Sequence, residues 1–255
     1  MEKENLSKIT VEICAGSYRD CRTAWEAGAG RVELNSALSL GGLTPGLSDF
    51  LAAKKDCGCP IVCMVRPRGA GFCYRAEEIR MMLEDARRFL ENGADGIAFG
   101  FLREDRRVDG EWTRRMCRLI HGYGKEAVFH RAFDVTPDAD AAMETLLDCR
   151  VDRVLTSGQK GTAMEGISLI AHLQETYGSW IEILPGSGLN GGNAAQMIRQ
   201  SGVRQIHASC KGYGRDLTTT GNGVTYACLC PPYEDGYLMV DGDAVRELVK
   251  AVQAC

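Results

Sequence analysis

The sequence lacks a long apolar run and an excess of basic charge. No stretch approaches the roughly 18 consecutive apolar residues that would suggest a membrane span. Lys and Arg number 30 against 34 Asp and Glu, so the formal net charge is −4. A nucleic-acid binder needs a basic stripe to contact phosphates. We therefore expect neither a membrane nor a nucleic acid as a partner.

The sequence also lacks a signal peptide and a C-x-x-C motif. The first ten residues, MEKENLSKIT, are polar and contain no apolar core, so we expect a cytoplasmic protein. In that compartment the 12 cysteines are expected to stay reduced. The tightest pairs are Cys57 with Cys59 and Cys228 with Cys230, and neither has a matching second pair, which argues against a structural zinc site. Most of the cysteines are expected to be small buried hydrophobic residues.

The 255 residues show a regular alternation of short apolar runs with longer segments of helical period. Such runs suit strands buried on both faces. We predict strands over residues 10–14, 31–34, 61–66, 96–99, 127–130, 153–156, 180–184 and 205–208. Eight strands, each followed by a helical segment, indicate an α/β protein: a single-domain (β/α)8 TIM barrel over residues 1–255.

Several helix starts carry recognisable signals. Ser17, Asp109 and Asn193 precede predicted helices over 18–27, 110–121 and 194–200, and Asp243 opens the last helix, over 244–254. Pro137, a residue type favoured in a first turn, precedes the helix predicted over 138–148, and a long helix is predicted over 77–91.

Residues 209–241 do not fit the alternation. They are rich in Gly and Thr and contain Pro231 and Pro232. A structureless connection of this length is uncommon in a compact domain. We interpret the segment as an elaborated connection after the eighth strand, with a short extended piece at 237–240.

Polar side chains gather where the predicted strands end, and barrel enzymes place their active sites at that face. Charged residues within apolar strands are costly unless they are paired. We expect the following five either to compensate one another or to face a ligand: Glu12, Glu33, Arg66, His130 and Arg131. The alternative for each one alone is a buried ion pair or a hydrogen-bonded core histidine.

A histidine near carboxylates could act as a general acid or base, with arginine orienting an anion. The catalytic candidates are therefore His130, Glu12, Glu33 and Asp134. Ligand-binding candidates from the same strand ends are Arg66, Arg68, Arg131, Ser157, His207 and Ser209. Cys14 is a candidate nucleophile or soft-metal ligand, and a buried inert thiol is the alternative.

Two glycine-containing loops predict an anion site. Gly186 and Gly188 follow the seventh strand, and Gly212 and Gly214 follow the eighth, next to Lys211. Phosphate sites in barrels are often built from these two loops and a nearby helix N-terminus. The alternative is that the glycines only permit tight turns.

Taken together, these residues give the chain a resemblance to the CutC copper homeostasis family. The resemblance covers nearly the whole chain, in order, through VEIC (11–14), AGAGRVEL (27–34), GGLTP (41–45), MVRPRGAGFCY (64–74), GADGIAFGFL (93–102), VFHRAFD (128–134), RVLTSG (153–158), LPGSGL (184–189) and IHASCKG (206–212). It implies a cytoplasmic TIM barrel, often a homo-oligomer, that binds copper(I). Cys14 is then the expected metal ligand.

One departure from the family pattern bears on copper. The family usually has a cysteine after the Glu-Leu of the second strand, where this chain has Asn35. Soft thiolate ligands suit copper(I), and asparagine does not. The alternative function is therefore an enzyme that acts on a small anionic, perhaps phosphorylated, substrate by proton transfer or lyase chemistry. A third alternative is a non-catalytic homodimer or higher oligomer in which residues 209–241 contact a partner subunit.

Overall fold

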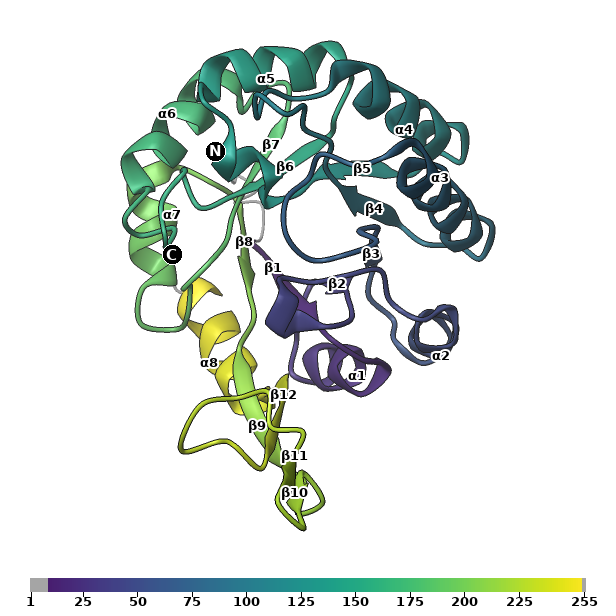
Figure 1. Cartoon of the computed structure of the whole chain (residues 1–255). Helices are drawn as coiled ribbons and strands as arrows, with labels where there is room; N and C mark the ends of the chain where they lie inside the picture. The colour runs from purple at the N-terminus through teal and green to yellow at the C-terminus, as the bar shows by residue number, and fades with distance from the viewer. Residues whose placement is uncertain (1–8, 254–255) are drawn as a thin grey trace.

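The computed structural model describes residues 9–253, and a barrel of eight parallel strands forms its centre (Figure 1). Neighbouring strands follow the order β7-β6-β5-β4-β3-β2-β1-β8, and a bridge between Gly186 and His207 links the two ends of the sheet. The predicted single (β/α)8 barrel is therefore confirmed. The strands are β1 (Thr10–Ala15), β2 (Arg31–Leu34), β3 (Ile61–Met64), β4 (Gly96–Phe99), β5 (Glu126–Phe129), β6 (Arg153–Thr156), β7 (Glu182–Pro185) and β8 (Gln205–Ala208).

All eight predicted strands are present, and four of them, β1, β3, β5 and β7, differ from the prediction by one or two residues at one or both ends. β3 stops at Met64, because Arg66 leaves the sheet: its backbone N–H donates to the Thr44 hydroxyl and its carbonyl accepts from Thr44 N–H. β7 begins at Glu182 rather than residue 180, because Trp180 belongs to the turn that ends the preceding helix and is 72% exposed. β5 is shifted by one residue and ends before His130.

Within residues 9–253, eight helices surround the barrel (Figure 1). Those following Gly46 and Gly166 had no start signal in the sequence, because neither glycine can provide a side-chain cap. The helices are α1 (Tyr18–Glu26), α2 (Leu47–Asp56), α3 (Ala76–Glu91), α4 (Gly110–Gly122), α5 (Ala139–Asp148), α6 (Ile167–Tyr177), α7 (Ala194–Ser201) and α8 (Gly242–Gln253), with 3-10 turns η1 (Leu38–Leu40) and η2 (Arg131–Val135). The predicted end of the last helix, at residue 254, lies outside the described residues.

The capping predictions are confirmed in part. Ser17 and Asp109 accept backbone N–H groups of the first turns of α1 and α4. Asn193 precedes α7, but its side chain accepts from Asn190 N–H and closes the preceding turn instead of capping the helix. The expectation for Asp243 is wrong, because Asp241 accepts the first N–H groups of α8 and Asp243 lies within its first turn.

Residues 209–241 form an arm that projects from the barrel beyond α1 and α8 (Figure 1). In the arm, β9 (Lys211–Arg215) pairs antiparallel with β12 (Gly236–Val240), and β10 (Thr220–Gly221) pairs with β11 (Val224–Thr225). The extended piece predicted at 237–240 is confirmed. Asp20 of α1 fastens the base of the arm, since its carboxylate accepts from Val240 N–H at 2.8 Å.

Most cysteines lie in the core, as expected. Of the 11 cysteines in the described part of the chain, seven are buried, Cys14 is half-buried, and Cys73, Cys228 and Cys230 are exposed. Burial raises the pKa of the Cys63 thiol well above its usual value, which keeps such groups inert. Among the helices of residues 9–253, none has the length and apolar character needed to cross a membrane.

Candidate functional site

A cavity of about 250 Å³ lies at the carboxyl ends of the barrel strands. Residues from or just after β1, β2, β3, β5, β6, β7 and β8 line it, so it stands at the face where the sequence predicted the site. Nine of the predicted site residues are among its lining: Cys14, Glu33, Arg66, His130, Arg131, Gly188, His207, Ser209 and Lys211.

Below the cavity, the buried carboxylate of Glu12 joins three strands. It is 1% exposed, forms a close ion pair with the Arg31 guanidinium, and lies 2.8 Å from Nδ1 of His207. Arg31 also donates to Gln205. Burial alone would raise the pKa of Glu12, but Arg31 and His207 hold it well below its usual range. Of the alternatives for Glu12, the buried ion pair is the one present, and its partner is Arg31 in the neighbouring strand and not one of the other four candidates.

The fixed imidazole of His207 stands beside two other potential ligands. One ligand atom each from Cys14, Glu33 and His207 lies within 4.8 Å of the others, and Nε2 of His207 is 4.0 Å from the Glu33 carboxylate. Burial raises the pKa of both Cys14 and Glu33. Burial opposes the charge on His207, but its hydrogen bonds with Cys14 and with the accepting Glu12 carboxylate, together with the charges of Glu33 and Glu12, raise its pKa well above the usual value. The three side chains are suited to hold a metal ion.

Asn35 lies against this cluster. Its amide donates to the Glu33 carboxylate at 2.9 Å and to Sγ of Cys14 at 3.5 Å, while its Oδ1 has no partner among the described residues. Gly42 makes room for it, because a Cβ at that position would lie 2.4 Å from Oδ1. Asn35, which stands where the family usually has a cysteine, therefore lies next to the thiol of Cys14.

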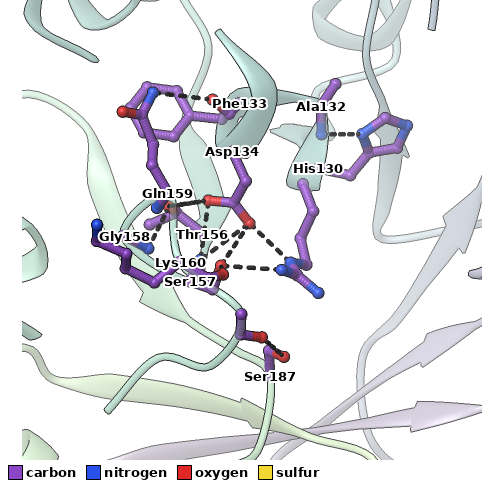
Figure 2. A network of polar contacts seen from close by, with 12 residues as sticks. His130, Ala132, Phe133, Asp134, Thr156, Ser157, Gly158, Gln159, Lys160 and Ser187 are labelled. Carbon is purple, nitrogen blue, oxygen red and sulfur yellow. Dashed lines mark hydrogen bonds and ion pairs between the residues drawn. The ribbon is translucent and has the colours of Figure 1, made fainter. Parts of the chain in front are cut away.

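On another part of the wall, His130 has no carboxylate partner among residues 9–253. Its Nδ1 accepts from Ala132 N–H at 3.1 Å, and its Nε2 is buried without a hydrogen-bond partner (Figure 2). Burial, together with the Arg66 charge, lowers the pKa of His130 to about 3. The expected grouping of His130 with carboxylates is wrong: His207 is the histidine that stands among them.

Arg66 likewise has partners that differ from those expected. Its terminal nitrogens donate to the backbone carbonyls of Leu40, Gly42 and Ala70 at 2.6–3.0 Å. Its Nε is buried and has no acceptor in the described part of the chain. Backbone carbonyls therefore hold the guanidinium, and no carboxylate pairs with it among the described residues. Of the two expectations for Arg66, compensation by a carboxylate is not met, and a place in the cavity lining is.

Comparisons with known proteins show to which family the chain belongs. The model of the CutC family matches residues 9–212. A CutC family protein of Treponema denticola is 42% identical over 249 residues, which cover 97% of this chain and all of that protein. The human copper homeostasis protein cutC homolog is 38% identical over 79% of this chain and 73% of its own length. This chain belongs to the CutC family.

A solved CutC structure supports the assignment. The crystal structure of a CutC protein from Streptococcus agalactiae superimposes with a TM-score of 0.74 at 31% identity, covering 79% of this chain and 98% of that one. A phosphoribosyl anthranilate isomerase of Thermococcus kodakaraensis matches with a TM-score of 0.58 at 16% identity, which shows the shared barrel alone. The CutC family model ends at residue 212, so most of the arm lies beyond it.

Asp134 and Ser157 of this CutC barrel belong to a separate polar network (Figure 2). The Asp134 carboxylate accepts from the hydroxyls of Thr156 and Ser157 at 2.5 and 2.9 Å and from Arg131 at 2.7 Å. The Ser157 hydroxyl also lies 2.6 Å from the Lys160 carbonyl, so its single proton is shared between the carboxylate and this carbonyl. With these bonds formed, the carboxylate ties the loop after β5 to the loop after β6. Neither Asp134 nor Ser157 lines the cavity.

The prediction that the glycines after the eighth strand form an anion-binding loop is wrong. Gly212 and Gly214 lie in β9 and pair with β12, so they belong to the arm. A Cβ at Gly214 would meet the Tyr237 ring at 2.3 Å, which explains the glycine without an anion. Of the first loop, Ser187 and Gly188 line the cavity.

Two other predicted ligand-binding residues lie outside the cavity lining. Gly186 forms the closing bridge with His207. Arg68 pairs with the Glu78 carboxylate and donates to nearby backbone carbonyls, among them that of Cys73. Gly186 therefore serves the closure of the barrel, and Arg68 fastens the loop after β3 to α3.

The buried, neutral His130 predicts a loss of stability in mild acid. In the unfolded chain, His130 binds a proton below its ordinary pKa of 6.5. The folded chain excludes that proton until its pKa of about 3 is reached. The free energy of unfolding therefore decreases as the pH is lowered from 7 to 5. We expect His130→Gln to lose less stability than the wild type between pH 7 and pH 5, by about 2 kcal/mol.

Urea unfolding at the two pH values measures the difference. His172→Gln, a change at an exposed histidine of α6 that pairs with Asp140, is the comparison and should alter the pH dependence less than His130→Gln. Equal pH dependence in His130→Gln and the wild type would contradict a neutral buried imidazole.

Proposed function

We propose that this CutC family member binds copper(I) in the cytoplasm as part of copper homeostasis, through Sγ of Cys14 and Nε2 of His207, with Glu33 beside them. The observation that carries the proposal is the convergence of these three ligand atoms within 4.8 Å. The names of the human relative and of the Streptococcus agalactiae structure refer to copper homeostasis. Copper is here the cargo that the protein holds.

The donor set suits copper(I) in its two softer members. A thiolate and an imidazole are ligands that copper(I) accepts, whereas a carboxylate suits harder ions. Glu12 supports this arrangement, because it takes up the Nδ1 side of His207 at 2.8 Å and leaves Nε2 on the side of Cys14 and Glu33. A carboxylate behind a ligating histidine is a common arrangement at metal sites and fixes the tautomer of the ring.

We expect Cys14→Ser to reduce copper(I) affinity to the level of a protein without the site, because it removes the one thiolate. Glu12→Gln should weaken binding by about 10–100-fold, since it loosens the orientation of His207. Asn35→Cys should tighten binding, because it places a second sulfur next to Cys14. Competition against a colorimetric copper(I) chelator under anaerobic conditions measures all three affinities.

Cys73→Ser is the matched control, because it removes an exposed thiol on a loop outside the cavity lining. It should leave the affinity unchanged. If Cys14→Ser binds copper(I) as tightly as the wild type, the site assigned to copper is wrong.

The cytoplasmic location rests on the chemistry of the thiols. Three exposed cysteines, Cys73, Cys228 and Cys230, and the half-buried Cys14 are free thiols. A reducing compartment keeps such groups from pairing with other thiols. It also holds copper as copper(I), the state that the proposed ligands suit.

A second candidate function is an enzyme that acts on a small anionic, perhaps phosphorylated, substrate by proton transfer or lyase chemistry. Three positively charged side chains, Arg66, Arg131 and Lys211, line the same cavity as Glu33. Burial raises the pKa of Glu33, and a raised carboxyl pKa is typical of a general acid. Glu12 and Asp134, which are fully engaged in ion pairs and hydrogen bonds, do not suit that role.

For the second candidate, we expect a phosphosugar or carboxylate from a broad panel to raise the melting temperature, since ligands that bind only the folded state stabilise it. Arg66→Ala should remove the shift. Arg103→Ala, a change at an exposed arginine outside the cavity lining, should preserve it. A flat response of the wild type across the panel would count against an anionic substrate.

The arm favours a homodimer or a higher oligomer. Large apolar side chains are exposed along it, including Leu217 at 74% and Tyr226 at 83%, and Tyr213 stacks on Tyr233 with ring centroids 3.7 Å apart. Exposed apolar patches of this kind commonly mark an interface. A second copy of the chain is the proposed partner.

We expect light scattering to give at least twice the chain mass of 27.8 kDa. The double variant Leu217→Ser, Tyr226→Ser should lower the mass to that of one chain, because it removes apolar area from the interface. Trp180→Ser, which removes an exposed aromatic ring on the barrel, is the control and should stay associated. A monomeric wild type would rule out the proposed assembly.

A further inference from the structure

We infer that Cys14, Glu33 and His207 also form a zinc site with one open coordination position, which an anionic oxygen of a small ligand fills from the cavity. All three side chains line the cavity at the mouth of the barrel. This site deepens the second candidate function, on which it rests only for the use of the open position. Zinc and copper(I) exclude each other here, because both need Sγ of Cys14 and Nε2 of His207.

The three donors form a set that zinc accepts as a whole. Zinc in proteins binds cysteine sulfur, histidine nitrogen and carboxylate oxygen, usually as four ligands in a tetrahedron. Copper(I) favours the soft sulfur and accepts the imidazole, whereas a carboxylate suits harder ions. Zinc therefore gives a role to Glu33, whose carboxylate is placed beside the other two ligands and is 3% exposed.

The charges of the cluster match a dication. With a metal bound, Cys14 and Glu33 each carry one negative charge and His207 is neutral. The neighbouring Glu12 carboxylate is already paired with the Arg31 guanidinium. Zn²⁺ therefore neutralises the cluster, whereas Cu⁺ leaves the charge of Glu33 without a counterpart within it. An uncompensated charge at a buried position is costly.

The distances are close to those of a tetrahedral site. Zinc bonds of about 2.0 Å to nitrogen and oxygen and about 2.3 Å to sulfur put neighbouring ligand atoms about 3.3–3.5 Å apart. The three ligand atoms lie within 4.8 Å of one another, and Nε2 of His207 is 4.0 Å from the Glu33 carboxylate. Movements of about 1 Å therefore bring them to bonding distance. Glu12 already fixes the far side of the His207 ring, as outer-shell carboxylates do at metal sites.

Asn35 keeps the fourth position open. Its amide N–H groups donate to the Glu33 carboxylate at 2.9 Å and to Sγ of Cys14 at 3.5 Å, so it supports two ligands without being one. A cysteine at this position would offer a fourth protein ligand. Zinc sites with four protein ligands are closed and structural, whereas those with three leave room for water or substrate. The fourth ligand therefore comes from the cavity of about 250 Å³.

The cavity lining indicates what fills that position. Lys211 is exposed and Arg131 is half-buried, and both line the same cavity as the three zinc ligands. Cationic side chains at the rim favour an anion. The ligand class is therefore a small molecule whose carboxylate or phosphate oxygen reaches the zinc ion while the rest of its charge faces Lys211 and Arg131.

Competition of the full chain against a fluorescent zinc chelator tests the site. We expect one zinc ion per chain at this site and a loss of affinity of at least about 100-fold in Glu33→Gln, since removing a direct ligand costs more than the roughly 10–100-fold of an outer-shell partner. The same variant should keep its copper(I) affinity within about tenfold, because sulfur and nitrogen remain. Equal zinc affinity in Glu33→Gln and the wild type would overturn the inference.

Glu104→Gln is the matched control, because it changes an exposed glutamate outside the cavity lining. It should keep both the zinc and the copper(I) affinity of the wild type.

Cobalt(II) in place of zinc reports the coordination of the wild type without any variant. We expect a thiolate-to-cobalt charge-transfer band and the intense visible absorption of a tetrahedral ion. Inorganic phosphate or acetate, added separately, should change the visible spectrum by entering the open position, and the stronger response tells which oxygen the site prefers. In Asn35→Cys, four protein ligands should make the spectrum insensitive to both anions. A six-coordinate spectrum without the thiolate band, or no response of the wild type to either anion, would contradict the site.

The failures of the three assignments are distinguishable. Unchanged copper(I) affinity in Cys14→Ser, together with the loss of zinc affinity in Glu33→Gln, removes the copper assignment and supports the zinc site. A cobalt form that responds to phosphate or acetate, from a protein that turns over no member of the substrate panel, supports the open position and removes the second candidate function.

Discussion

The site depends on one buried interaction, the carboxylate of Glu12 between Arg31 and His207. A carboxylate that is 1% exposed is stable as an anion only when opposite charge and hydrogen bonds replace water. Arg31 comes from β2 and His207 from β8, so the carboxylate joins the strands on both sides of β1. By taking the Nδ1 side of His207, Glu12 also decides which ring nitrogen faces Cys14 and Glu33. The hydrogen bond between Glu12 and His207 therefore both joins β1 to β8 and orients the His207 ring toward Cys14 and Glu33.

Above that contact, the cavity has two walls of different chemistry. One wall combines a thiol, an imidazole and a carboxylate in Cys14, His207 and Glu33. The other contains only donors, the N–H groups of Arg66 and His130, set against the Phe72 ring. The first wall suits a soft cation, and the second carries the positive charge of Arg66 beside the neutral ring of His130. Membership of the CutC family, with copper homeostasis in the names of its relatives, bears directly on the first wall and leaves the second to be explained by its own geometry.

Much of the fold was predictable because the signals are local. Buried strands appear as short apolar runs, and all eight were located within two residues at each end. The helices after Gly46 and Gly166 were not delimited, because they begin without a side-chain cap. In the site, the lining of the cavity was largely predicted, since residues at the carboxyl ends of barrel strands must converge. The partners of those residues were not: His130 was expected among carboxylates, and His207 stands there.

The sequence by itself determined the barrel, the face that holds the site, and the presence of Cys14 and Asn35 at neighbouring strand ends. Only the tertiary structure decided that β8 closes against β1 and brings His207 to Glu12, 195 positions away in the chain. It also decided that backbone carbonyls hold Arg66 and that Gly212 and Gly214 belong to the arm. The physical reason is one of range. Burial and periodicity are properties of a segment, whereas the choice of a hydrogen-bond partner depends on which side chains the closed barrel places within about 3 Å of each other.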